Sequence, residues 1–504
     1  MSKTESETES SPESDWESNS SVYSDEEYIG FENCNPNEGI PSDGDYSLSI
    51  TPSTSPQAKQ FSLDVESLIQ KDNLFVSHAN NRHLAITIVY SLDHIPSTYL
   101  DILGMNSKDC VKLYLEFGSR YLTAASTPEI KIANAGSIQW QLTNCLKQFV
   151  MDNADEYCQK FKNQNYKSSS SYLIGLVDHF ISRVNNPGSY CVNCDKDLKY
   201  QGLKPVSCGN ALCYYQYTEL GLSCYQYGNS GVTSSLLNEI KFHSGISSLL
   251  CYFAYACIVN QHRRITIFGE MPDHIVNECN GSHEKAFDKM KYILESMPSI
   301  EELSQCAEES DLKMILSSID PDAYYFIRWI FLTCRAHLEA IDSNDPQFQA
   351  DLKIESTAPA SNYSSGFSKN IKAVFKYISN PPEREMAFNE ISKKKSIEKH
   401  VGFHGSPAEN WHSIVRNSLI NYSGTKEQLH GAAYGSGIYF AQDFQTSCGY
   451  AKSGVEWKAG NLKDLKCMVF CEILNDGSDG FKNANPYYVI SKENLVRTKY
   501  LIVM

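Results

Sequence analysis

Residues 401–419, VGFHGSPAENWHSIVRNSL, join the end of a strand to a helix and decide the fold of the C-terminal part of the chain. Ser406 and Glu409, with a proline between them, have the spacing of a capping box, so we expect a helix to begin there. Apolar residues then recur at three- and four-residue spacing, which predicts that this helix packs inward. His404 and Gly405 fall at the end of the preceding strand, where a glycine lets a ligand approach the backbone. The stretch therefore predicts a small-molecule site.

A second glycine-rich stretch follows at residues 435–450, GSGIYFAQDFQTSCGY. Its first glycines permit a tight entry into a short strand. Tyr439 and Tyr450 flank Ser447, which provides two aromatic faces and a hydroxyl able to hold a flat ring that bears an amide. The stretch lacks the third glycine of the dinucleotide fingerprint and its strand–helix–strand context. A Rossmann site is therefore not expected.

Three motifs occur in order along the C-terminal part: FHGSPAENWHSIVRNSL, YGSGIYFA and the closing YYVISKENLVRTKYLIVM. Together they resemble the catalytic domain of the poly(ADP-ribose) polymerase family, and within it the mono-ADP-ribosylating subgroup, most closely members 6 and 8. The resemblance covers residues 345–504. It implies a split antiparallel β-sheet of the ADP-ribosyltransferase type. It also implies that the chain uses NAD+ as co-substrate, releases nicotinamide and attaches single ADP-ribose units to protein acceptors, including itself.

The resemblance also implies which residues bind NAD+. His404 would bind a ribose hydroxyl of the nicotinamide half, and the backbone of Gly405 would bind the carboxamide, whose recognition Ser447 would complete. Tyr450 would stack on the nicotinamide ring, and Tyr439 would close the other side. The full set implied for NAD+ binding is His404, Gly405, Ser406, Tyr439, Ser447 and Tyr450.

The third signature position of the family is a glutamate in its polymerising members. In this chain the resemblance places Tyr487 there, with Tyr488 as the alternative if a loop length differs, so that the catalytic set is His404, Tyr439 and Tyr487. A phenol accepts a proton poorly at neutral pH, and chain elongation should be lost. A carboxylate acceptor needs no activating base, so we expect Glu or Asp acceptors, with Cys as the second choice. The alternative function is a catalytically inactive NAD-binding scaffold or interaction protein.

A cysteine constellation lies outside the three motifs, with the spacing C-x2-C-x13-C-x4-C. Its members are Cys191, Cys194, Cys208 and Cys213. Two close pairs separated by a loop suit tetrahedral Zn2+, and four thiolates leave no open coordination position, so we predict a structural zinc site. The alternative is a group of ordinary buried thiols.

Composition divides the rest of the 504-residue chain, for which we expect a multidomain α+β architecture. Strands and then a helix predict a small α/β domain, ubiquitin-conjugating-like in its order, which we interpret as a packing or interaction domain. The helical prediction includes residues 323–341, AYYFIRWIFLTCRAHLEAI. The predicted regions are a disordered acidic head (1–60), the small α/β domain (61–180), a cysteine-rich segment (185–230), a mainly helical region (231–344) and the catalytic domain (345–504).

The net charge of −16 disfavours direct binding of nucleic acid. No stretch reaches the roughly 20 apolar residues of a membrane-spanning helix, and residues 246–259, ISSLLCYFAYACIV, are instead predicted to form a buried helix. The sequence opens with polar and acidic residues instead of the basic start and apolar run of a signal peptide, so we expect none. We therefore expect an intracellular protein without membrane insertion, located in the cytoplasm, with the nucleus as the alternative.

Overall fold

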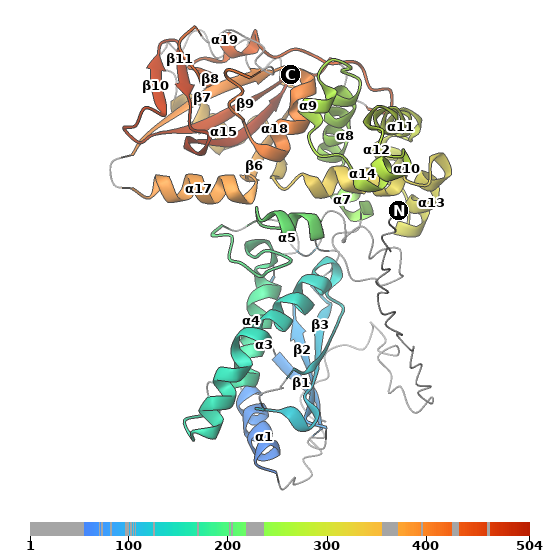
Figure 1. Ribbon diagram of the computed structural model, residues 1–504, viewed down its shortest axis with the longest axis vertical. Coiled ribbons are helices and arrows are strands. Elements are labelled where there is room, and N and C mark those ends of the chain that lie inside the picture. The colour runs from blue at the N-terminus through green and yellow to red at the C-terminus, as the bar shows by residue number, and fades with distance from the viewer. Residues whose placement is uncertain are drawn as a thin grey trace, which may run out of the picture. The chain divides into compact units, whose positions relative to one another are not determined.

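The computed structural model describes residues 55–504, apart from short interruptions and the longer stretches 218–235, 355–370 and 426–432 (Figure 1). The predicted head therefore lies outside the described residues as far as residue 54. Helix α1, Pro56–Leu68, begins directly after it, and the side chain of Ser55 caps the helix by accepting the N–H of Ala58 at 3.1 Å. The folded part thus begins before residue 61, the predicted boundary, because a serine followed by a proline already starts a helix there.

The first folded region combines a four-stranded antiparallel sheet, in the order β1-β2-β3-β4, with α1, which precedes the strands in the sequence, and with α3 and α4, which follow them (Figure 1). Strand β3 alternates between buried and half-buried residues, as a strand with one covered face does. These elements have an apolar core of their own. Their bounds are β1 Leu74–Asn80, β2 Ala85–Ser91, β3 Cys110–Glu116, β4 Glu129–Ala133, α3 Gln139–Lys162 and α4 Tyr172–Asn185.

The second region is helical and centres on α8, Ser244–Ile258, in which every residue from 246 to 258 is buried. A helix that is apolar all round must be covered on all sides, so the predicted buried helix is confirmed. No helix in the described part of the chain has the length and apolar character needed to cross a membrane. The other helices are α7 Leu236–Phe242, α9 Arg264–Phe268, α10 Asp273–Glu278, α11 His283–Ser296, α12 Ile300–Leu303, α13 Glu309–Ile319 and α14 Ala323–Thr333.

The prediction of a helix over residues 323–341 is wrong in its second half. Helix α14 ends at Thr333, and strand β5, His337–Ile341, follows. β5 pairs along its length with β6, Ala373–Ser379. Pairing with a distant strand has overridden the local helical pattern, and the C-terminal sheet therefore begins before residue 345, the predicted boundary.

The C-terminal sheet has eight strands in the order β10-β11-β8-β7-β9-β12-β6-β5, with antiparallel neighbours. Strand β7 shares nine paired positions with β9 but only one, Phe403 with Ala441, with β8. The sheet therefore opens between β7 and β8 just where residues 404–406 end β7. The remaining strands are β7 Glu398–Ser406, β8 Ile438–Ala441, β9 Cys467–Asn475, β10 Phe481–Ala484, β11 Tyr487–Ile490 and β12 Val496–Val503.

The helix predicted after Ser406 begins later and without a capping box. A short 3-10 turn, Ala408–Asn410, precedes α18, Trp411–Asn417, and neither uses a side-chain cap. The Ser406 hydroxyl instead accepts the Asn410 side-chain amide at 2.8 Å, and Glu409 accepts a bond from Asn260 at 3.2 Å. Contacts with the helical region have replaced the local cap. The inward packing of α18 is confirmed, since Trp411 is fully buried.

His412 in α18 gives the fold a testable pH dependence. The ring is fully buried, stacks on Phe268 with centroids 4.2 Å apart, and has no hydrogen-bond partner for either nitrogen among the described residues. Burial, and then the charge of Arg416, hold the pKa of His412 well below its usual value of 6.5. Below pH 6.5, His412 therefore binds a proton in the unfolded chain but stays neutral in the folded chain. The stability that this neutral ring contributes is complete above pH 6.5 and is lost as the pH falls below it.

We expect the free energy of unfolding to fall by about 1 kcal/mol less between pH 7 and pH 5.5 in His412→Phe than in the parent chain. Chemical denaturation followed by tryptophan fluorescence measures this difference, because Trp329 lies 6.4 Å from the imidazole. His262→Gln, at an exposed position, is the control and should keep the parental pH dependence. Identical slopes for the parent and His412→Phe would mean that the ring does not remain neutral.

Candidate active site

A cavity of about 420 Å³ lies where β7 and β8 separate. This volume is within the range of small-molecule and cofactor sites. All residues predicted to bind or process NAD+ line it, namely His404, Gly405, Ser406, Tyr439, Ser447, Tyr450 and Tyr487. The structure thus brings together side chains from strands β7, β8 and β11 and from the short helix α19, Phe444–Cys448.

His404 has a defined tautomer. Its Nδ1 lies 2.9 Å from the carbonyl oxygen of Tyr439, which only accepts, so Nδ1 carries a hydrogen and donates it. Burial lowers the pKa of His404 below 6.5, although the bond to Tyr439 acts in the opposite direction. At neutral pH the ring is uncharged, and Nε2 is a hydrogen-bond acceptor.

Gly405 lies where the backbone of β7 meets helix α19. A Cβ at this position would be 2.3 Å from the carbonyl oxygen of Ser447 and 3.1 Å from the amide nitrogen of Ala451. No side chain fits at the first of these distances. The close approach fixes Ser447, which is 2 % exposed, beside the backbone of Gly405. Asp443 caps this helix by accepting the Thr446 N–H at 2.8 Å.

Four of the tyrosines that line the cavity contact one another, namely Tyr434, Tyr439, Tyr450 and Tyr487. The Tyr439 hydroxyl donates to the carbonyl oxygen of Gly435 at 2.7 Å and accepts the N–H of Tyr434 at 2.9 Å, so it holds the chain before β8. The hydroxyls of Tyr450 and Tyr487 lie 3.5 Å apart. That bond, followed by partial burial, raises the pKa of Tyr487 to about 12. Tyr487 therefore keeps its proton at neutral pH.

Strand register distinguishes Tyr487 from its neighbour Tyr488. On β11, Tyr487 is opposite Ala441 and Tyr488 is opposite Phe440, so the two phenols point to opposite faces. Tyr487 lines the cavity, whereas Tyr488 packs against His400 with centroids 5.1 Å apart. Of the two candidates, Tyr487 is the one that lines the cavity, and its catalytic role stays a prediction.

Sequence reasoning did not assign further polar residues that line the cavity, among them Tyr434, Asn410 and Arg263. Asn410 lies in the motif FHGSPAEN and Tyr434 in YGSG, so their closeness to His404 and Tyr439 in the sequence could have indicated them. Arg263 follows α8, about 140 residues before His404 in the chain, and no motif marks it. Arg263 reaches the cavity because the helical region packs against α18 and against the turn that precedes α18, and this packing is not visible in the sequence.

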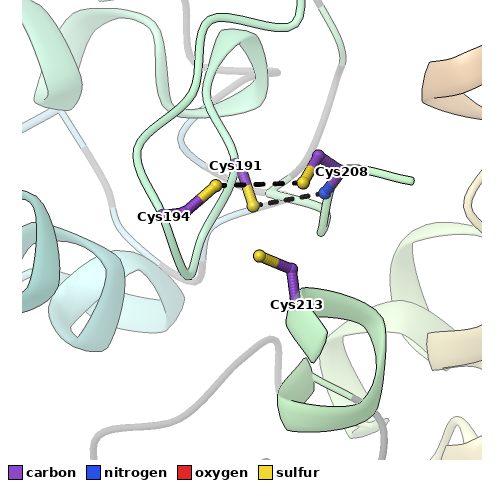
Figure 2. A group of neighbouring side chains, drawn as sticks. All are labelled: Cys191, Cys194, Cys208 and Cys213. Atoms are coloured by element: carbon purple, nitrogen blue, oxygen red, sulfur yellow. Dashed lines mark hydrogen bonds between the residues drawn. The ribbon is translucent and has the colours of Figure 1, made fainter. Parts of the chain in front are cut away.

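The four cysteines form a separate candidate metal centre. Their sulfur atoms all lie within 4.8 Å of one another and converge on one point, two from a single loop, one from a second loop and one from helix α5, Ala211–Tyr215 (Figure 2). Cys194 and Cys208 have sulfurs 3.8 Å apart. A tetrahedral zinc with Zn–S bonds of about 2.3 Å requires sulfurs about 3.8 Å apart. None of the cysteines in the described ranges is in a disulfide.

Residues 355–475 match the family model of the poly(ADP-ribose) polymerase catalytic domain. Protein mono-ADP-ribosyltransferase PARP8 of Homo sapiens is 26% identical over 367 residues, which cover 66% of this chain and 39% of the relative, and PARP8 of Mus musculus gives the same values. Protein mono-ADP-ribosyltransferase PARP16 of Mus musculus is 28% identical over 125 residues, covering 20% of this chain and 37% of the relative. The chain thus spans about two fifths of the length of the curated relatives that it matches.

The match includes the motifs that carry His404, Tyr439 and Ser447, and these residues line one cavity at the opening of the antiparallel sheet. The resemblance that the motifs indicated is therefore confirmed: residues 355–475 of this chain match the poly(ADP-ribose) polymerase catalytic domain.

Proposed function

We propose that this protein is an NAD+-dependent protein mono-ADP-ribosyltransferase. The observation that carries the proposal is the cavity in which His404, Tyr439, Ser447 and Tyr450 meet with no carboxylate among the described residues that line it. The names of the relatives, which are mono-ADP-ribosyltransferases, support it.

In this proposal the residues of the cavity bind the nicotinamide half of NAD+. The uncharged His404 accepts a hydrogen bond from a ribose hydroxyl at Nε2. The hydroxyl of Ser447 and the backbone of Gly405, held together by the close approach of their chains, bind the carboxamide. The ring of Tyr450, which is 39% exposed at the mouth, stacks on the nicotinamide.

The reaction breaks the bond between ribose C1′ and the nicotinamide nitrogen, and the bonding electrons leave with nicotinamide, which becomes neutral. Positive charge grows on the ribose, so a site that fixes the sugar and surrounds it with oxygen atoms lowers the barrier. An acceptor carboxylate then attacks C1′ and forms an ester without losing a proton. Glu and Asp are therefore the proposed acceptors, on this chain and on other proteins, with Cys thiolate as the second choice.

Elongation requires a different step, in which a ribose hydroxyl loses its proton as it attacks. A base must take that proton. Tyr487 keeps its own proton at neutral pH, and the described lining residues include no Asp or Glu. The proposed product is therefore a single ADP-ribose unit.

Incubation of the purified chain with NAD+ labelled in the ADP-ribose half tests this function. We expect one discrete labelled band and no ladder, since no group at Tyr487 can activate a hydroxyl. Hydroxylamine at neutral pH should release the label if the bond is an ester, and peptide mass spectrometry should then locate it on Glu or Asp. A ladder would contradict the single-unit product. A chain that binds NAD+ without labelling any protein would instead be the inactive scaffold.

We also propose that Cys191, Cys194, Cys208 and Cys213 hold one structural Zn2+. The support is the convergence of the four sulfurs and the small size of the surrounding core, whose buried residues besides three of these cysteines are Leu198 and Val206. Bound zinc would supply a cross-link among four chain positions and no catalytic position, because thiolates fill its coordination.

A further inference from the structure

The helical region contributes a positively charged side chain, Arg263, to the lining of the cavity. Among the described residues that line it, Arg263 is the only one with a permanent charge, and no Asp, Glu or Lys is present. His404, the other titratable base there, is uncharged at neutral pH because burial lowers its pKa. A ligand that is anionic along part of its length would find its counter-charge at Arg263.

Hydrogen bonds tie Arg263 to the end of β7. Its Nη1 donates to the side-chain oxygen of Asn410 at 3.1 Å, and the Asn410 amide donates to the Ser406 hydroxyl at 2.8 Å. The backbone N–H of Arg263 donates to Asn260 at 3.3 Å, and the Asn260 amide reaches Glu409 at 3.2 Å. The guanidinium is thus placed through side-chain contacts with the same turn that follows Gly405.

The helix before Arg263 packs firmly on the catalytic part. Phe253 of α8 stacks on Trp411 with centroids 6.0 Å apart, and both rings are fully buried. Tyr252 accepts the N–H of Gly454 at 3.3 Å. Arg263 lies in the turn between α8 and α9, and the helix before this turn is buried from Ile246 to Ile258.

We propose that Arg263 binds the diphosphate of NAD+, so that the helical region completes the donor site of the C-terminal domain. This inference rests on the proposed function. Two phosphate charges that enter a half-enclosed cavity need a counter-charge, and a guanidinium binds phosphate oxygens in pairs. Arg263 would then favour the whole dinucleotide over nicotinamide alone.

Calorimetric titration of Arg263→Gln with NAD+ and with benzamide tests the role. Benzamide has the flat ring and carboxamide of nicotinamide but no phosphate. We expect the Kd for NAD+ to rise about 10- to 100-fold while the Kd for benzamide stays within about two-fold. Arg263→Lys should fall between, because a point charge cannot bind two oxygens as a fork. Lys458→Gln, which removes an exposed positive charge outside the cavity, should match the parent for both ligands.

Each result decides one claim. If Arg263→Gln binds NAD+ as tightly as the parent does, Arg263 has no role in diphosphate binding. An equal loss for NAD+ and benzamide would also overturn the inference, since Arg263 would then only support the shape of the cavity. A parent chain that binds neither ligand would contradict the proposed function instead. Raised salt should weaken binding of NAD+ to the parent more than to Arg263→Gln.

Discussion

His404→Ala is expected to reduce NAD+-dependent labelling of the chain at least about 100-fold. The imidazole offers an acceptor at Nε2 inside the cavity, and its Nδ1–H holds the carbonyl of Tyr439 on the facing strand at 2.9 Å. Alanine removes both contacts, so the ribose loses its partner and β8 loses a bond across the opening of the sheet. Because the lost contact acts on the sugar that carries the developing charge, the effect should appear in kcat as well as in KM.

The same strand offers a matched control in His400. Its ring packs on Phe481 and Tyr488 and does not line the cavity. His400→Ala should therefore label within about two-fold of the parent once equal folded protein is compared. His404→Gln, which keeps an acceptor on a more flexible side chain, should recover part of the activity. Parental labelling by His404→Ala would show that the donor site has been assigned to the wrong residues.

The residues proposed for the donor site, which line one cavity, could be named from the sequence because they lie in short local motifs. His404 and Gly405 are adjacent, and residues 439–450 contain a strand end and the helix that carries Ser447. The choice between Tyr487 and Tyr488 required the structure. Side chains alternate across a strand, so a one-residue error in a count reverses the face, and only the register with β8 decides it.

What the sequence could not predict depends on contacts between distant segments. The helical pattern of residues 337–341 is locally sound, but these residues pair with β6 and become β5. Ser406 has the spacing of a helix cap, yet Asn410 occupies its hydroxyl. In both places an interaction made only in the folded chain outweighs a local preference worth about 1 kcal/mol. Arg263 was the hardest residue to predict, since no motif near it in the sequence indicates that it lines the cavity.

Removal of the proposed zinc is expected to have the largest effect on stability. Among the described residues, the core around the cysteines contains five buried apolar residues, three of them cysteines of the cluster. A core of this size cannot offset the entropy lost when the segment folds. Structural zinc sites supply about 10–16 kcal/mol of binding free energy at neutral pH. We therefore expect Cys191→Ser to lower the zinc content from about one ion per chain to nearly none and to expose residues 190–217 to limited proteolysis.

The loss should spread beyond the cysteines, because neighbouring residues of the segment join it to other parts of the fold. Asp195, next to Cys194, receives two bonds of 2.7 Å from Arg183 of α4. The ring of Tyr214, next to Cys213, lies under the guanidinium of Arg335, with the cation 5.0 Å from its centroid.

Mass spectrometry of the metal and a thermal melt of each variant measure both effects. Cys110→Ser, a half-buried thiol on β3, is the control and should keep its zinc and its melting temperature. If Cys191→Ser melts like the parent and neither protein holds zinc, the four cysteines are ordinary packed thiols. The contacts of Asp195 with Arg183 and of Tyr214 with Arg335 would then stabilise this small core instead.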